Sequence, residues 1–403
     1  MDTGLQQNSK QEKGKLSLLL EVLLVSTKLG LTSFGGPIAH LGYFREEYVK
    51  RRKWLDEKTY ADLVALCQFL PGPASSQVGM GIGFIRAGFL GALFSWIGFT
   101  LPSVIALVLF AYFLKGTSFH DTGWLHGLLV VAVAVVAQAV WGMAKSAASD
   151  RPRATIAIAA AILTLLIPSV FSQVGIILAA GILGWFLFRG TADDKPAFLS
   201  LSSNKKVASI LLALFFVLLA ILPIIRQATH SPFVALFDSF YRSGALVFGG
   251  GHVVLPLLQA EVVPAGWLSA DQFLAGYGAA QAVPGPLFTF ASYVGMASFG
   301  WKGAIVTTIA IFLPSFLLIM GTLPFWNWLR HHPQFQAALQ GISAAVVGIL
   351  LAALYNPVWT SSIKTPFDVC LALAAFGILT IWKCPPWIVV ACSAAAGAFF
   401  SIM

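Results

Sequence analysis

Two Pro-Gly-Pro motifs interrupt apolar stretches of the chain, and a glutamine precedes each motif by three residues. The two sets are Gln68 with Pro71, Gly72 and Pro73, and Gln281 with Pro284, Gly285 and Pro286. Proline lacks an N–H and disfavours helical geometry in the residue before it, so each motif must break a helix. The second proline suits the first position of a new helix. The sequence therefore predicts two helix N-termini inside apolar segments.

Such an N-terminus attracts an anion, because its first amides have no partner within the helix and the helix dipole adds positive potential. Hydroxyl groups follow both breaks, at Ser75 and Ser76 in the first and at Thr289 in the second. The amides of Gln68 and Gln281 add further donors. We predict an oxyanion site from these groups. The alternative is a kink around which neighbouring helices pack.

A Phe-Gly-Gly motif lies upstream of each Pro-Gly-Pro motif, at Phe34-Gly35-Gly36 and at Phe248-Gly249-Gly250. Paired glycines let the backbone turn sharply or approach a ligand closely. Pro37 can start a helix after the first motif, whereas Gly251 stands at that position after the second. The glycines are predicted substrate contacts, and tight helix packing is the alternative.

Lys28 and Arg242 each lie six residues before a Phe-Gly-Gly motif, within apolar sequence. A cation at the centre of a membrane helix costs about 2.5–3.5 kcal/mol even on the most lenient scale. Two cations at equivalent positions would attract a dianion toward the middle of the bilayer. Alternatively, both side chains extend to the membrane surface.

Two acids lie near these cations. Glu21 is seven residues from Lys28, and Asp238 is four residues from Arg242, so each acid lies on the helical face of its cation. Each acid forms either a structural ion pair or a proton-coupling group.

Other chemistry finds no support in the sequence. His331 and His332 have no neighbours that complete a metal site, and the four cysteines show no C-x-x-C spacing. No nucleophile, base and orienting group occur together at helical spacing, as an enzyme acting on a lipid-linked substrate would need. We therefore predict no catalytic residue, no metal and no cofactor.

The elements that must position these groups are membrane helices. The chain has 403 residues, of which 58% are hydrophobic and 10% are charged. Its mean hydropathy is +0.83, which is typical of a protein dissolved in lipid. The predicted spans are 16–33, 88–114, 124–145, 153–168, 173–189, 207–225, 234–250, 301–323, 336–355, 367–382 and 386–402. Two further apolar stretches, 61–85 and 272–298, contain the Pro-Gly-Pro motifs.

The formal charge is +9. Lys and Arg cluster in loops between apolar segments, so membrane topology explains the charge and no nucleic-acid partner is expected. The first apolar run is not followed by a signal-peptidase site and is predicted to stay as a membrane helix.

Residues 28–103 and 242–315 form an internal repeat. Both contain Phe-Gly-Gly, Trp-Leu, Gln-x-x-Pro-Gly-Pro and Leu-Pro-Ser in the same order, with spacings that agree within two residues. The loop 45–58 is basic, whereas the equivalent loop 259–271 carries Glu261 and Asp271 and no Lys or Arg. Basic loops stay in the cytoplasm, so the two halves are predicted to have opposite orientations.

This gives a predicted fold class: an all-α polytopic membrane protein with two inverted-topology repeats and broken or re-entrant helices at both motifs. Residues 1–190 would form the N-terminal repeat and 234–403 the C-terminal repeat. Between them, 191–233 would hold a basic linker and a helix that reverses the orientation. The N-terminus is predicted to be cytoplasmic and the C-terminus external.

The Phe-Gly-Gly-Pro run at 34–37, the basic segment ending at Trp54-Leu55 and the duplicated Gln-x-x-Pro-Gly-Pro motif make this chain resemble the chromate ion transporter family in its long, two-domain form. The resemblance implies proton-driven efflux of chromate across a bacterial cytoplasmic membrane, with sulfate as a similar competitor, and chromate resistance. Oxyanion uptake, for example of sulfate, and a passive anion channel stay open as alternatives. The expected partners are chromate or sulfate, membrane lipid and, as an alternative to a monomer, a second copy in a homodimer.

Overall fold

The computed structural model describes residues 2–34, 36–114, 123–167, 170–188, 204–248, 251–326 and 332–400. Throughout these ranges the regular structure is helical. In the first half the helices are α1 (Asp2–Thr32), α2 (Gly36–Phe44), η1 (Arg45–Arg51), α3 (Glu57–Phe69), α4 (Ala74–Phe113), α5 (Gly123–Ala147), α6 (Arg151–Leu166) and α7 (Val170–Leu187). A connecting helix, α8 (Lys205–Thr229), follows.

The second half repeats this order. Its helices are α9 (Pro232–Leu246), η2 (Gly251–Val253), α10 (Val254–Val262), α11 (Ala270–Ala282), η3 (Leu287–Thr289), α12 (Phe290–Thr322), η4 (Leu323–Phe325), α14 (Pro333–Ala353), η5 (Leu354–Trp359), α15 (Thr360–Ser362), α16 (Pro366–Thr380) and α17 (Pro386–Phe400). Every apolar segment predicted above overlaps one of these helices.

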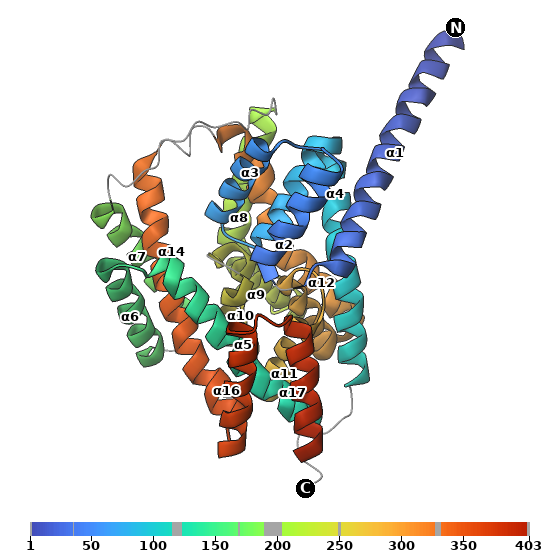
Figure 1. Cartoon of the computed structure of the whole chain (residues 1–403). Coiled ribbons are helices and arrows are strands. Elements are labelled where there is room, and N and C mark those ends of the chain that lie inside the picture. The colour runs from blue at the N-terminus through green and yellow to red at the C-terminus, as the bar shows by residue number, and fades with distance from the viewer. Residues whose placement is uncertain are drawn as a thin grey trace.

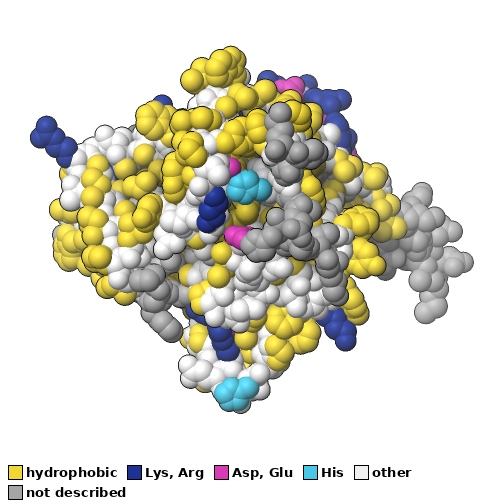
Figure 2. Space-filling view, turned by 90° about the horizontal axis from the view of Figure 1, so that it is seen from below, with side chains coloured by type: hydrophobic (Ala, Val, Ile, Leu, Met, Phe, Trp, Pro, Cys, Tyr) yellow, Lys and Arg dark blue, Asp and Glu magenta, His cyan; other side chains and the backbone are white. Residues whose placement is uncertain are grey.

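Five helices in the described part of the chain are long and apolar enough to cross a membrane. They are Ala74–Phe113, Gly123–Ala147, Lys205–Thr229, Leu287–Phe325 and Gln336–Ser362. Large apolar side chains of α8 face outward, with Ile210 and Ile224 each 65% exposed. Figure 2 shows the molecule from below, with hydrophobic side chains along much of its outline and charged side chains in a few places. A bilayer is the solvent that suits such a surface.

The helices α3 and α11 are equivalent, and each leads into a Pro-Gly-Pro motif. Each has 13 residues and a side-chain cap at its start. Asp56 accepts a hydrogen bond from the Thr59 amide, and Ser269 accepts one from the Gln272 amide. These caps satisfy amides that have no partner inside the helix. The two approaches to the motifs are thus built alike.

After each motif the chain forms a helical hairpin. In α4 the backbone breaks at Ala87 and Gly88, where Gly88 has φ +68°. Ser95 Oγ donates to the Gly79 carbonyl over 2.8 Å, so residues on either side of the break lie opposite one another. The segments before and after Gly88 therefore run antiparallel.

The second half has the same hairpin in α12. Its break is at Phe299 and Gly300, where Gly300 has φ +67°. Thr307 Oγ1 donates to the Ala291 carbonyl over 2.7 Å, again across 16 residues. The internal repeat is therefore present in three dimensions as well as in sequence.

The two halves are interlocked (Figure 1). The first-half helix α5 packs against α16 and α17, and the second-half helix α14 packs against α6 and α7. Glycines allow the close approach: a side chain at Gly127 would meet the Ser393 backbone, and one at Gly341 would meet the Ala180 backbone. Small residues at helix crossings are typical of membrane proteins, because association there depends on close van der Waals packing.

Substitution of Gly83 tests the hairpin. An added Cβ would lie 2.8 Å from Ser95 Cβ and would also meet the Gly91 carbonyl. We expect Gly83→Ala to destabilise the fold by about 1–3 kcal/mol, because the two arms must separate. The melting temperature of the detergent-purified protein measures the effect. Gly42→Ala is the control, since a Cβ there meets nothing within 4 Å. Equal melting temperatures for the two variants would contradict the hairpin contact.

Candidate functional site

The glycine at the centre of each Pro-Gly-Pro motif hydrogen-bonds to the opposite half of the molecule. The Gly72 amide donates to the Val247 carbonyl over 2.6 Å, and the Gly285 amide donates to the Ser33 carbonyl over 2.9 Å. Val247 and Ser33 both directly precede a Phe-Gly-Gly motif. The breaks of both repeats therefore meet at one centre, related by an approximate twofold symmetry.

The serines of the two Leu-Pro-Ser motifs complete this centre. Ser103 Oγ donates to the Pro284 carbonyl of the other half. A side chain at Gly285, with φ +98°, would collide with Ser103 Oγ, and one at Gly72, with φ +114°, would collide with Ser315 Oγ. Two facts therefore require glycine at both positions: the positive φ disfavours other residues, and a side chain would have no room.

The starts of the new helices differ from the prediction. Pro73 and Pro286 occupy the N-cap positions, one residue before the first helical residue, which in the second half begins a 3-10 turn. The Thr289 amide, predicted to be unpaired, donates to the Pro286 carbonyl over 3.0 Å. The Thr289 hydroxyl also donates to that carbonyl, over 2.7 Å. The tight 3-10 turn satisfies both groups locally, so the prediction of Thr289 as a free donor is wrong.

Several buried polar atoms around the centre have no hydrogen-bond partner within the described part of the protein. Ser75 Oγ is paired with His40 Nδ1 at 3.2 Å, but the hydroxyl of Ser76 is not paired. The other atoms of this set are Ser33 Oγ, Gln77 Oε1, Gln281 Nε2 and Ser315 Oγ. Leaving a buried polar group unsatisfied costs about 1–3 kcal/mol. A cluster of such groups therefore favours a site that a polar ligand fills.

Two cavities flank the centre. The first, of about 510 Å³, is lined by Gln68, Phe69 and, from the other half, Phe248. The second, of about 420 Å³, is lined by Gln281, Gly285 and, from the other half, Phe34. Gln68 and Gln281 are equivalent in the repeat, as are Phe248 and Phe34. Each cavity therefore combines the helix that leads into one Pro-Gly-Pro motif with the Phe-Gly-Gly element of the other half.

Among the predicted glycines, Gly36 begins α2 and lines the second cavity. Gly35, Gly249 and Gly250 lie outside the described residues.

The predicted cations, Lys28 and Arg242, are held by glutamates. Lys28 Nζ lies 2.8 Å from Glu47 Oε2, and Arg242 Nη2 lies 2.8 Å from Glu261 Oε1. Each second-half residue stands 214 positions after its first-half counterpart, so the two ion pairs are equivalent. The prediction had placed Lys28 beside Glu21.

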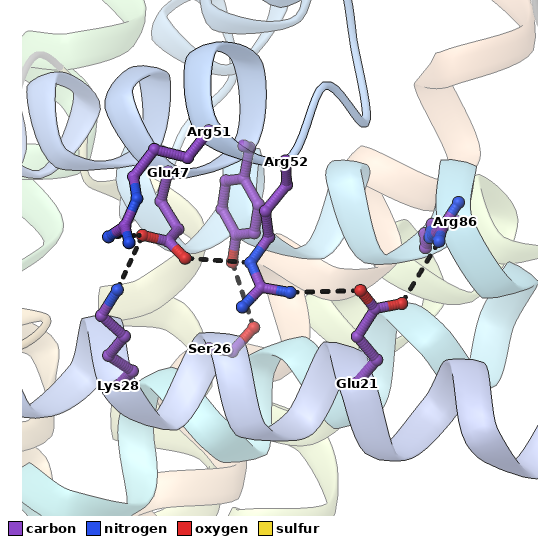
Figure 3. A network of polar contacts seen from close by, with 8 residues as sticks. Glu21, Ser26, Lys28, Glu47, Arg51, Arg52 and Arg86 are labelled. Carbon is purple, nitrogen blue, oxygen red and sulfur yellow. Dashed lines mark hydrogen bonds and ion pairs between the residues drawn. The ribbon is translucent and has the colours of Figure 1, made fainter.

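Around Glu47 the ion pair extends into a network (Figure 3). Glu47 also accepts from Arg51 over 3.1 Å and from Arg52 over 2.9 Å. Glu21 instead pairs with Arg52 and Arg86, at 3.1 and 3.2 Å. Burial opposes ionisation of Glu47, but hydrogen bonds from Lys28 and Arg52 outweigh it and hold the pKa of Glu47 below its ordinary value. The network ties α1 to the segment that carries the first Phe-Gly-Gly motif.

The second network is more buried. Asp238, whose side chain is fully buried, pairs with Arg242 at 2.9 Å and with Arg226 at 3.2 Å. Arg226 also contacts Glu261 at 3.2 Å, and Ser239 Oγ donates to Glu261 over 2.6 Å. Buried charges persist only when paired and hydrogen-bonded in this way.

Sequence reasoning missed Ser103, Ser315, Gln77 and the glutamates as parts of the centre. The sequence repeat could have identified the two serines and the two glutamates, because each residue recurs at the equivalent position of the other half. Gln77, whose Nε2 donates to the Pro71 carbonyl over 2.7 Å, has no such signal, since its counterpart is a phenylalanine.

Fold and site together define a multi-pass membrane protein of two related halves that meet at a polar centre. The chromate transporter family model matches residues 20–185 and 234–398, one segment in each half. The chain therefore belongs to the chromate transporter family, and it is a transporter rather than an enzyme.

Full-length relatives agree with this assignment. An uncharacterized transporter of Methanocaldococcus jannaschii is 28% identical over 354 residues, covering 86% of both chains. The chromate transport protein of Pseudomonas aeruginosa is 28% identical over 376 residues, covering 88% of this chain and 86% of the relative. That of Cupriavidus metallidurans is 26% identical over 373 residues, covering 91% and 88%. No solved structure matches the chain.

Substitution of Gly72 tests the crossing of the two halves. We expect Gly72→Ala to lose chromate transport, because its Cβ collides with Ser315 and displaces the break. Gly266→Ala is the matched control: Gly266 also has positive φ, of +69°, but lies in open space. Both substitutions place a side chain on backbone with positive φ, but only Gly72→Ala also creates a collision. Similar chromate uptake by the two variants in membrane vesicles would show that the contact with Ser315 is unimportant.

A double-mutant cycle with Lys28→Gln and Glu47→Gln tests the first ion pair. Glu47 is 7% exposed and Lys28 is 47% exposed, so we expect a coupling of about 1 kcal/mol. Thermal unfolding of the four proteins measures it. The same cycle on Arg45 and Glu57, a pair exposed by 53% and 51%, should give a smaller coupling. A coupling no larger than in that control would mean that Glu47 does not hold Lys28.

Proposed function

We propose that this protein exports chromate from the bacterial cytoplasm across the inner membrane, driven by the proton-motive force, and thereby confers chromate resistance. Family membership and the relatives described as chromate transport proteins support chromate as the substrate. Chromate is a tetrahedral dianion, which needs several directed donors and positive potential.

The observation that carries the proposal is the meeting of both broken helices at one centre. The Gly72–Val247 and Gly285–Ser33 hydrogen bonds fix the two breaks there. Unpaired donors and a cavity on each side surround them. An oxyanion would bind between Gln68 or Gln281, the hydroxyl of Ser76 and the backbone of the two Pro-Gly-Pro motifs.

We further propose that the two repeats have opposite orientations, with a cytoplasmic N-terminus and an external C-terminus. In support, α1 begins and α17 ends at opposite ends of the molecule (Figure 1). Residues 1–190 and 234–403 would then be the inverted repeats, reversed by α8 within 191–233. Each Pro-Gly-Pro hairpin would enter and leave the membrane on one side, and the two cavities would open alternately.

The charged networks have a part in this cycle. Lys28 and Arg242 would supply positive potential near the centre, and the paired Glu47 and Glu261 would partly neutralise it. Glu21 and Asp238 are the proposed proton-coupling acids. Asp238 is the stronger candidate of the two, because its side chain is fully buried whereas that of Glu21 is 35% exposed.

Transport of labelled chromate into inside-out vesicles tests this function. We expect accumulation when a pH gradient, acidic inside, is imposed, and its loss when an ionophore collapses the gradient. Excess sulfate should compete. Vesicles without the protein are the control.

Other results of this vesicle experiment would indicate a different function. Chromate flux that ignores the gradient would indicate a passive channel. Accumulation of sulfate rather than chromate, in right-side-out vesicles, would indicate an uptake system for another oxyanion. Either result would overturn proton-driven chromate export.

A further inference from the structure

The second cavity contains a cation that the repeat motifs do not account for. Lys383 lines it, in the connection between α16 and α17, together with Pro385, Pro386 and Trp387. Trp387 also contacts the ring of Phe34, with centroids 6.0 Å apart, so this connection lies against the first Phe-Gly-Gly motif. The connection between the two C-terminal helices thus places a positive charge at the second cavity.

Lys383 is free to bind a ligand. It has no ion pair or hydrogen bond to the part of the chain that the structure describes, and its side chain is exposed. Its backbone has φ +53°, a left-handed conformation that costs a residue with a side chain about 1–2 kcal/mol. The basic residue of the first cavity, Arg153, is instead committed to Asp150, with Nε 2.6 Å from Oδ2. The second cavity therefore has the more available positive charge.

The rest of the lining suits an oxyanion. Gln281 also belongs to this lining; its side-chain amide nitrogen is buried beside Tyr277 and has no hydrogen bond within 3.5 Å in the described structure. Pro386 begins α17, a helix of 15 residues, so its positive dipole end is at the cavity. Among the residues that the structure describes, no Asp or Glu lines this cavity. The α17 N-terminus offers few free N–H groups, since Pro385 and Pro386 have none and the Ile388 amide donates to the Pro385 carbonyl over 3.1 Å. The lysine cation, the side-chain amide of Gln281 and the helix dipole therefore form the anion site.

We propose that Lys383 and Gln281 form an oxyanion subsite in the second cavity, at the N-terminus of α17. Chromate would pass through this subsite on one side of the centre where the two Pro-Gly-Pro breaks meet. The inference deepens the proposed function and rests on it. It assigns to the C-terminal helices a direct part in substrate binding.

The test is the KM for chromate in vesicles containing Lys383→Gln. We expect KM to rise at least tenfold while the maximal rate changes less, because the cation contributes to ground-state binding. Lys383→Arg should retain a near-normal KM. Lys302→Gln is the matched control, since Lys302 is an exposed lysine beside Trp301 and outside the cavity.

Chemical rescue separates charge from structure. In Lys383→Cys, a thiol reagent that adds an ethylammonium group should restore KM, whereas a neutral reagent of similar size should not. The same reagents on the wild type control for the native cysteines. Equal KM values for Lys383→Gln and Lys302→Gln, or rescue by the neutral reagent, would overturn the subsite. That result would leave the export function standing, which fails only if the wild type itself moves no chromate.

Discussion

The structure depends on one constraint: a helix broken inside the membrane region exposes backbone groups that lipid cannot satisfy. Here each break forms a hydrogen bond with the opposite half of the molecule. The Gly72 amide donates to the Val247 carbonyl, and the Gly285 amide donates to the Ser33 carbonyl. The break in either repeat therefore requires the other repeat. This explains why the motifs occur as pairs at matching spacing, and why both central glycines must be glycine, since a side chain would strike Ser315 or Ser103.

The same reciprocity organises the charges. Lys28 and Arg242 would be costly alone in apolar sequence, but Glu47 and Glu261 pair with them at equivalent positions. Because the acids belong to the segments just after the Phe-Gly-Gly motifs, each ion pair also fixes the angle at which the chain enters the centre. Ion pairs of this kind contribute more to geometry than to net stability. Under the proposed function, the cations would act on the site through their field and through the position they impose.

Much of the fold was predictable from sequence, because apolar length, proline and the repeat are local signals. The helix breaks at both Pro-Gly-Pro motifs and the helical nature of the apolar segments were expected, and the family resemblance is confirmed. The partner of Lys28 was predicted wrongly, since spacing along one helix favours Glu21 whereas the fold supplies Glu47. Crossing contacts such as Gly72 to Val247 join residues far apart in sequence, and no periodicity reveals them.

The two halves, although alike at the centre, differ in what surrounds it. The first cavity has an arginine bound to its own aspartate, whereas the second has a lysine shortly before α17 that pairs with no residue the structure describes. If the two cavities open to opposite sides of the membrane, as proposed above, identical sites would hold the substrate equally well on both sides. Unequal sites make one side the stronger binding position, and the energy input must then be spent on release from it. Duplication thus supplies the paired breaks and divergence makes the two cavities chemically unequal, while under the proposed function the coupled proton gradient sets the direction of net transport.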